Sequence, residues 1–301
     1  MYDILIAGSG PAGLTAAIYA ARANFSFIIA EKEYMGSGTV NSAEQINNYP
    51  GLQGISGFDL GEKLRSHAAA LGAQFKTAEI TKISREGNRF ISFLSSGETI
   101  ESKTVLYAAG TRHRPLEISG AKLAGVSYCA VCDGALYRNK SVAVIGGGDT
   151  ALADSLYLAK ASSEVYLIHR RSEFRAAASL VEQAKNNDRI KIITGAVPLR
   201  ILGENKVSGI ELKCGEKTET VEVSGVFTAI GTIPNTEILK GTVELDSSGY
   251  IIADESGVTS LSGFFAAGDV RTKALRQIVT ACSDGANCVN SIENYLLTDG
   301  S

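Results

Sequence analysis

The sequence has little of what would place a protein in a membrane, on nucleic acid or outside the cell. No apolar run approaches the roughly 20 residues of a membrane-spanning helix. The 29 basic and 32 acidic residues nearly cancel, so the net charge of −3 gives no electrostatic reason to bind nucleic acid or an acidic membrane. The first residues enter an apolar strand pattern at once, which leaves no room for a signal peptide. We expect a cytoplasmic globular protein, and 301 residues suffice for two domains.

Cysteine and histidine are also scarce. Five cysteines are an odd number for so long a chain, which argues against the disulfide framework of a small secreted protein. Only Cys129 and Cys132 lie close together, and the other cysteines and the three histidines supply no second pair with metal-ligand spacing. We therefore predict no metal site. Cys214 is interpreted as an incidental thiol, and Cys282 and Cys288 as packing residues in preference to a second redox pair.

Glycine, by contrast, is abundant and marks a nucleotide-binding pattern near the N-terminus. Gly8, Gly10 and Gly13 stand between an apolar run, residues 2–7, that predicts a buried parallel strand and an alanine-rich segment that predicts a helix. Such glycines permit a tight turn and let a pyrophosphate approach the helix N-terminus. Glu31 closes the next predicted strand, where a carboxylate can bind a ribose hydroxyl. The acid favours FAD or NAD, and a plain glycine turn is the alternative.

A second pattern of the same kind begins 138 positions later. Gly146, Gly148 and Ala151 again stand between a predicted strand and a predicted helix. The strand that follows ends without an acid. The residues found there are His169, Arg170, Arg171 and Arg175. Guanidinium groups in this place can clamp a 2′-phosphate by paired hydrogen bonds, which predicts NADPH, whereas a solvated basic turn is the alternative.

The two patterns predict an α/β protein with two Rossmann-like three-layer nucleotide-binding domains, the second inserted into the first. Residues 90–94 and 98–101 predict antiparallel strands joined by a turn, and residues 105–110 predict a further buried strand that ends in glycine. We expect a discontinuous FAD-binding domain of residues 1–112 and 241–301 and an NADPH-binding domain of residues 113–240.

The pair of cysteines lies between the two glycine patterns. Ala130 and Val131 leave Cys129 and Cys132 as the only reactive groups of the motif, and Asp133 follows directly. Disulfide exchange needs a thiolate to attack and a protonated thiol to leave, and a nearby carboxylic acid can supply that proton. We predict that Cys129, Cys132 and Asp133 are catalytic. Buried structural thiols are the alternative.

Taken in order, these motifs resemble those of the low-molecular-weight, bacterial-type thioredoxin reductases, class-II members of the pyridine nucleotide-disulfide oxidoreductases. The resemblance covers essentially the whole chain, and the ordered set is far more specific than any single motif. The matching segments are Gly8-Ser9-Gly10-Pro11-Ala12-Gly13, Asn48-Tyr49-Pro50-Gly51, Cys129-Ala130-Val131-Cys132-Asp133-Gly134, Gly146–Ala151, His169–Arg175, Gly231–Thr236, Ala267-Gly268-Asp269-Val270 and Arg276-Gln277.

The resemblance implies a cytoplasmic homodimeric flavoprotein that passes electrons from NADPH through FAD and a Cys129–Cys132 disulfide to thioredoxin. Cys132 would face the flavin, Cys129 would attack thioredoxin, and Asp133 would be the acid, while the inserted domain would rotate about its two crossings. The residues implied in FAD binding are Gly8, Gly10, Pro11, Ala12, Gly13, Glu31, Lys32, Gly38, Thr39, Asn48, Gly268, Asp269, Arg276, Gln277 and Ile278. Those implied in NADPH binding are Gly146, Gly148, Asp149, Thr150, His169, Arg170, Arg171, Arg175 and Gly231.

Three segments depart from the family pattern. Residues 37–41 replace the usual Gly-Gly-Gln-Leu-Thr, Thr232 stands where the family has histidine, and residues 280–285 are more polar than usual. Two alternatives therefore remain. One is the same dithiol chemistry with a ferredoxin-type donor or another protein disulfide as partner. The other is a flavin electron-transfer protein in which the two cysteines are structural.

Overall fold

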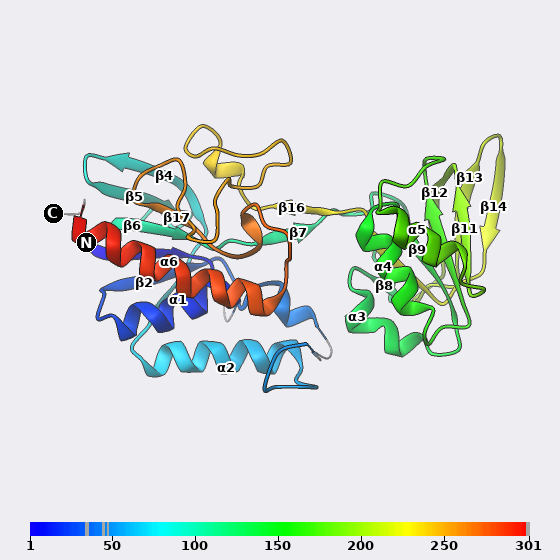
Figure 1. Cartoon of the computed structure of the whole chain (residues 1–301), viewed down its shortest axis with the longest axis horizontal. Coiled ribbons are helices and arrows are strands. Elements are labelled where there is room, and N and C mark those ends of the chain that lie inside the picture. The colour runs from blue at the N-terminus through cyan, green and yellow to red at the C-terminus, as the bar shows by residue number, and fades with distance from the viewer. Residues whose placement is uncertain (34–35, 44–45, 47, 299–301) are drawn as a thin grey trace. The chain divides into compact units, whose positions relative to one another are not determined.

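The computed structural model describes residues 1–33, 36–43, 46 and 48–298, apart from the side chains of Ser42 and Cys132. The chain forms two compact units, whose elements are labelled in Figure 1. Unit 1 comprises Met1–Arg112 and Ile233–Ser301, and unit 2 comprises His113–Thr232. Unit 2 is therefore an insertion in the sequence of unit 1.

Unit 1 is built, within the described residues, on a seven-stranded sheet of order β3-β2-β1-β6-β5-β4, with β17 also paired to β6. β1, β2, β3 and β17 pair in parallel, whereas β4, β5 and the first half of β6 form an antiparallel meander. Because β1, β2 and β17 are covered on both faces, they are short apolar runs, whereas the edge strand β3 is partly exposed. The strands span Tyr2–Ala7 (β1), Phe27–Glu31 (β2), Gln74–Thr77 (β3), Ile80–Glu86 (β4), Arg89–Leu94 (β5), Thr99–Tyr107 (β6) and Phe264–Ala266 (β17).

β6 differs from the sequence-based expectation because it joins what was predicted as two strands. Ser102 and Thr104, which lie between the two predicted strands, are fully buried and continue the ladder. The hydroxyl of Thr104 donates to the carbonyl of Asp3 at 2.8 Å. A buried hydroxyl that finds an acceptor costs little, so Thr104 does not break the strand, whereas the buried hydroxyl of Ser102 has no partner among the described residues.

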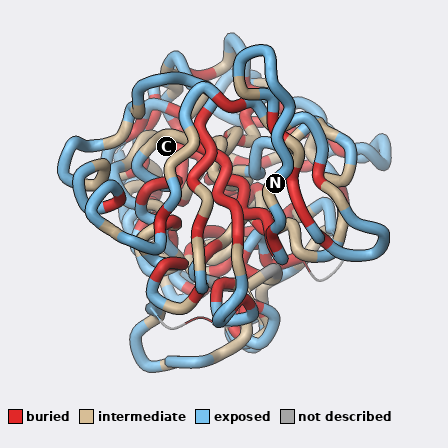
Figure 2. Tube along the Cα trace, turned by 90° about the vertical axis from the view of Figure 1, so that its right-hand side faces the viewer, coloured by how far each residue is buried: buried red, intermediate tan, exposed pale blue. Residues whose placement is uncertain are grey.

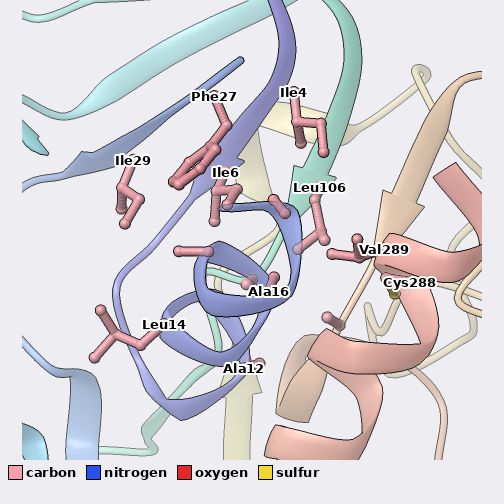
Figure 3. Packing of buried hydrophobic residues seen from close by; sticks show 14 of the residues in the cluster. Ile4, Ile6, Ala12, Leu14, Ala16, Phe27, Ile29, Leu106, Cys288 and Val289 are labelled. Carbon is pink, nitrogen blue, oxygen red and sulfur yellow. The ribbon is translucent and has the colours of Figure 1, made fainter. Parts of the chain in front are cut away.

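The core of unit 1 follows from strand alternation. Ile4 and Ile6 point to the face covered by α1 (Pro11–Arg22) and α6 (Ile278–Thr298), whereas Leu5 lies in the apolar cluster of the opposite face. Figure 3 shows Ile4 and Ile6 among the other side chains of this cluster, which include small, branched and aromatic residues such as Ala16, Leu106 and Phe27. α1 and α6 pack closely because their contact residues are small: a Cβ on Gly285 would lie 2.2 Å from the carbonyl oxygen of Ala12.

The remaining elements of unit 1 are short or peripheral. α2 packs against α1, and η1 packs against α2 through a small cluster of Val40, Ile46 and Leu60. These elements span Gly38–Ser42 (η1), Gly57–Ala70 (α2), Glu237–Leu239 (η3) and Gly268–Val270 (η4).

Unit 2 has a five-stranded parallel sheet of order β11-β10-β9-β15-β8. α4 and α5 cover one face, and the antiparallel sheet β12-β13-β14 covers the other, which gives three layers. The strands β9, β10 and β15 are buried over most of their length, and Figure 2 colours the tube by how far each residue is buried. The elements span Val126–Ser127 (β8), Ala130–Asp133 (α3), Gly134–Tyr137 (η2), Ser141–Gly146 (β9), Asp149–Leu158 (α4), Glu164–His169 (β10), Ala178–Lys185 (α5), Ile190–Thr194 (β11), Ala196–Leu202 (β12), Gly209–Cys214 (β13), Lys217–Val221 (β14) and Gly225–Ala229 (β15).

The chain crosses between the units through two paired strands, β7 (Thr111–His113) and β16 (Thr232–Pro234). The two units divide between residues 112 and 113 and between residues 232 and 233, and Leu239, which follows the second division, is fully buried in the core of unit 1. In the part of the chain that the structure describes, no helix has the length and apolarity to cross a membrane.

Candidate functional site

The first glycine loop joins β1 to α1 at the carboxyl edge of the unit 1 sheet. Gly8 has a φ of +104°, and a Cβ there would lie 2.6 Å from the carbonyl oxygen of Ala108. A Cβ on Gly13 would lie 2.0 Å from the carbonyl oxygen of Gly8, so α1 packs directly on its own loop. Gly10 is the N-cap and Pro11 follows, where the missing N–H is no loss. A helix start without a side-chain cap leaves amides available to an anion.

Glu31 ends β2 beside this loop. Its Oε2 accepts hydrogen bonds from the backbone N–H of Ser9 at 2.9 Å and from the hydroxyl of Ser9 at 2.8 Å. Its Oε1 accepts from the backbone N–H of Glu33 at 3.1 Å. Lys32, the next residue, is exposed. The structure thus fixes an acid at the loop, where a carboxylate can recognise ribose hydroxyls.

Two further segments of unit 1 reach the same loop. Gly38 and Thr39 open η1, and a Cβ on Gly38 would lie 3.2 Å from the Cα of Gly10. Gly268 opens η4 after β17, and a Cβ there would lie 3.0 Å from the Cβ of Ala12. Segments far apart in sequence therefore meet at the carboxyl ends of neighbouring strands, the edge where α/β sheets bind ligands.

Asp269 supplies the test of whether a flavin nucleotide fits here. Its Oδ1 is buried and has no hydrogen-bond partner in the described part of the chain. Burial raises the pKa of this carboxyl above its usual value. Buried polar atoms without a partner are rare, and a bound nucleotide carries hydroxyl donors. The residues of unit 1 therefore fit a flavin dinucleotide.

The segment that precedes α6 completes this group. The guanidinium of Arg276 donates to the carbonyl of Asp269 at 3.4 Å. The side-chain amide of Asn48 donates to the amide oxygen of Gln277 at 2.8 Å. Ile278 packs with the small cluster under η1. The predicted flavin residues thus lie in one unit, on segments joined by direct contacts.

A buried charge cluster behind η4 was not predicted. Asp284 accepts hydrogen bonds from the N–H of Gly268 at 2.8 Å, from Arg271 at 2.7 and 3.0 Å, and from Lys273 at 2.8 Å. Arg271 is 1% exposed and Asp284 2% exposed. The polar segment 280–285 was visible in the sequence, but its partners follow only from the packing of α6 on η4.

The second glycine loop joins β9 to α4 in unit 2. A Cβ on Gly146 would lie 2.5 Å from a carbonyl oxygen of β15, so this glycine is needed for packing. Gly148 is the N-cap of α4, and a Cβ there would meet no atom within 4 Å. Asp149 accepts a hydrogen bond from the N–H of Ala177 at 2.7 Å, and Thr150 is exposed. Open space therefore lies at this helix N-terminus, as a phosphate site requires.

His169 ends β10 and packs over this loop. A Cβ on Gly147 would lie 2.2 Å from the imidazole ring, so only glycine fits beneath it. The ring stacks on Phe174 with centroids 5.2 Å apart, and its Nε2 lies 3.0 Å from the carbonyl oxygen of Glu173. The imidazole is therefore a fixed part of the loop wall.

The arginines beyond His169 are held by their backbone while their side chains are exposed. The N–H of Arg175 donates to the carbonyl of Gly147 at 2.8 Å, and the carbonyl of Arg171 accepts from the next loop at 3.1 Å. Across the described residues, Arg170, Arg171 and Arg175 take part in no ion pair. Exposed guanidiniums beside an open helix N-terminus fit a phosphorylated pyridine nucleotide.

Gly231 lies at the same edge of the unit 2 sheet. It follows β15, whose last residue pairs with Gly146, and it has a φ of +101°. Its carbonyl accepts from the N–H of Arg114 at 3.0 Å. The predicted residues of the second nucleotide site are thus gathered at one edge of one unit.

The cysteine motif lies on α3 of unit 2. Cys129 is disulfide-bonded and directly precedes the helix, whereas Cys132 is within it and its side chain lies outside the described part of the structure. The N–H of Asp133 donates to the carbonyl of Cys129 at 3.1 Å. The carboxylate of Asp133 accepts from the hydroxyl of Ser127 at 2.6 Å. The acid is therefore one turn from Cys129, and Ser127, which sequence reasoning missed, binds it.

The other three cysteines are free. Cys288 is fully buried on α6, its thiol donates to the carbonyl of Ala266 at 3.4 Å, and burial raises the pKa of this thiol to about 12. Cys282 lies 3.9 Å from the hydroxyl of Tyr49, and Cys214 is half-buried on β13. No group of three His, Cys, Asp or Glu within the described ranges is arranged to hold a metal ion.

Comparisons with known proteins agree with this geometry. The family model described as pyridine nucleotide-disulphide oxidoreductase matches residues 2–285. The thioredoxin reductase of Treponema pallidum is 40% identical over 99% of this chain and 98% of its own length, and that of Listeria monocytogenes is 38% identical over 98% and 94%. The crystal structure of thioredoxin reductase from Streptococcus pyogenes superposes with a TM-score of 0.85 at 38% identity, covering 99% of both chains. The chain therefore belongs to the pyridine nucleotide-disulphide oxidoreductase family, and within it is similar to bacterial thioredoxin reductases.

Proposed function

We propose that this protein is an NADPH-dependent flavoprotein disulfide reductase that acts on thioredoxin or a thioredoxin-like protein. Family membership implies a flavin and a pyridine nucleotide. We assign FAD to unit 1 and NADPH to unit 2. The proposal includes a cytoplasmic homodimer, without a nucleic-acid or membrane partner.

The carrying observation is the disulfide-bonded Cys129 beside the Ser127–Asp133 hydrogen bond, in the unit that also presents exposed arginines at an open helix N-terminus. A redox-active disulfide with an acid one turn away suits thiol–disulfide exchange. A purely structural disulfide would have no need of a carboxyl group held at that position.

In this proposal the residues of each unit bind one of the two cofactors. In unit 1, Glu31 would bind the ribose of FAD, and Gly10 would let the pyrophosphate approach α1. Bound FAD would accept the reducing equivalents of the pyridine nucleotide and hold them for the protein disulfide. In unit 2, Arg170 and Arg171 would bind the 2′-phosphate of NADPH by charge-assisted hydrogen bonds.

The two cysteines and Asp133 would then perform the exchange. We assign Cys132 to the flavin side and Cys129 to the attack on the partner disulfide. Asp133 would protonate the departing thiolate. The paired strands β7 and β16 would be the hinge about which the inserted unit turns, since the chain passes between the units through them.

Anaerobic titration of the FAD-loaded protein tests the proposal. NADPH should bleach the flavin absorbance, and thioredoxin disulfide should then sustain turnover. A Cys132→Ser variant should keep the bleaching and lose the turnover, and Cys214→Ser should change neither. Bleaching by reduced ferredoxin and not by NADPH would contradict the assigned donor. Full disulfide reduction by the Cys132→Ser variant would contradict the assigned mechanism.

A further inference from the structure

Ser127 connects the acid of the cysteine motif to the sheet of unit 2. It is the last residue of β8 and is 5% exposed. Its Oγ donates to Oδ2 of Asp133 at 2.6 Å and accepts from the backbone N–H of Cys129 at 3.1 Å. The carbonyl of Cys129 is farther, at 3.3 Å, so the single hydroxyl proton goes to the carboxylate.

The position of Ser127 is set by the sheet. Ser127 pairs in register with Phe227 of β15, and the hydroxyl of Thr228 donates to its carbonyl at 3.4 Å. Phe227 is 1% exposed in the core of the unit. A side chain anchored on a packed strand loses little further freedom when it binds a neighbour, so its hydroxyl is preorganised.

The hydroxyl of Ser127 also binds the turn that carries the cysteines. Because it accepts from the N–H of Cys129, it fixes the backbone just before α3, while the N–H of Asp133 closes that turn on the carbonyl of Cys129. Ser127 therefore holds both ends of the segment Cys129–Asp133. Sequence reasoning assigned it no role.

We propose that Ser127 is a positioning residue for Asp133. The hydroxyl of Ser127 binds Oδ2 of the Asp133 carboxyl group. Oδ1 is then the atom that carries the proton and delivers it. The inference rests on the proposed disulfide reductase function and adds the residue that orients its acid.

In the exchange step, Asp133 supplies the proton that the departing sulfur needs. The thiolate of Cys129 attacks one sulfur of the partner disulfide, a new S–S bond forms, and the S–S bond of the partner breaks. The departing sulfur takes the electron pair and receives the proton from Oδ1 of Asp133. Asp133 is left as a carboxylate, which the hydroxyl of Ser127 stabilises by a charge-assisted hydrogen bond.

The test compares two disulfides that differ in their need for a proton. Thioredoxin disulfide releases an aliphatic thiolate, which leaves faster when protonated, whereas an aromatic disulfide such as dithiobis-nitrobenzoate releases a thiolate that leaves without help. In the FAD-loaded enzyme, Ser127→Ala should lower kcat for thioredoxin about 10–100-fold, a part of the usual contribution of a general acid. Turnover of the aromatic disulfide and the KM for NADPH should change less than about threefold.

Matched variants separate positioning from folding. Ser127→Thr retains a hydroxyl and should recover thioredoxin turnover to within about threefold of the unsubstituted enzyme. Ser162→Ala removes another buried hydroxyl of unit 2, which has no partner among the described residues, and should leave both substrates unaffected. An equal loss with both disulfides, or no rescue by threonine, would mean that Ser127 only supports the fold.

The failure of this inference is distinguishable from that of the proposed function. If the unsubstituted enzyme reduces thioredoxin with NADPH and Ser127→Ala does so at the same rate, only the positioning role is overturned. If the unsubstituted enzyme reduces neither disulfide, the proposed function falls and the inference falls with it.

Discussion

The two glycine loops have the same backbone plan and opposite chemistry at corresponding places. Positions 138 apart correspond, so Ser9 and Glu31 of unit 1 match Gly147 and His169 of unit 2. In unit 1 the loop residue donates two hydrogen bonds to the acid at the strand end. In unit 2 the loop residue is a glycine because the imidazole fills the space that a side chain would need.

This difference shows that the loop residue must match the residue at the end of the next strand, as Ser9 matches Glu31 and Gly147 matches His169. Ser9 satisfies a carboxylate, so unit 1 presents a fixed negative group to a ligand. Gly147 leaves room for the imidazole ring of His169. The charged groups that directly follow His169 in the sequence are exposed guanidiniums. This contrast is the basis for the proposal that unit 1 binds a ribose with free hydroxyls and unit 2 a ribose with a phosphate.

The largest effect is expected where the loops differ in packing. Gly13→Ala in unit 1 would place a Cβ 2.0 Å from a backbone oxygen and should destabilise the fold by about 3 kcal/mol or more. The corresponding position in unit 2 already holds alanine, and Ala151→Gly should cost only about 1 kcal/mol. Thermal unfolding followed by circular dichroism, together with flavin content, measures both. Equal losses would mean that the two helix starts do not differ in packing.

The next largest effect is expected on the preference of the second loop for NADPH over NADH. The double variant Arg170→Ala, Arg171→Ala should raise the KM for NADPH about 10–100-fold, because the charge-assisted hydrogen bonds of these exposed guanidiniums together contribute roughly 1.5–3 kcal/mol. The KM for NADH should rise less than about threefold. Steady-state kinetics with both nucleotides gives the ratio, and Lys185→Ala, an exposed basic residue of the same unit, is the control. Equal increases for NADPH and NADH would rule out a 2′-phosphate contact.

A smaller effect is expected at the first loop. Glu31→Gln removes the charge that would bind ribose hydroxyls and should weaken FAD binding about 10-fold, which corresponds to about 1.4 kcal/mol. Quenching of FAD fluorescence on addition to apoprotein gives the Kd. Glu33→Gln changes an exposed acid two positions away and should leave the Kd unchanged. A Kd that rises equally in both variants, or in neither, would remove Glu31 from the site.

How much of this the sequence could predict depends on the range of the interactions. The loops, their helices and the residues at the strand ends were predictable because an apolar run, spaced glycines and a following charge are local signals. α6 was not predicted, since Ser283, Asp284 and Asn287 have low helix propensity and the helix is stabilised by its packing on α1.

The missing residues of the candidate site share a physical reason. Asp284 meets Gly268 and Arg271 only after α6 has docked, and Ser127 meets Asp133 only because β8 joins the sheet beside β15. Neither contact has a fixed spacing that a sequence pattern can reveal. The place of Leu239 in unit 1 is likewise hidden from sequence patterns, because its burial depends on strands that lie far earlier in the chain.

The smallest expected effect lies in the helices that follow the loops, where buried Ala16 of α1 corresponds to Asp154 of α4. Burial raises the pKa of Asp154 to about 6, so between about pH 4 and pH 6 the folded protein binds a proton that the unfolded chain has released. The gain in the free energy of unfolding that this bound proton gives is therefore present at low pH and is lost as pH rises through 6. Asp154→Asn removes the charge but still buries an amide, so it should stabilise unit 2 by about 1 kcal/mol at pH 8 and by less at pH 5. Urea unfolding at both pH values measures the difference, with the exposed Asp188→Asn as control; a gain that grows toward pH 5 would contradict the sign of the shift.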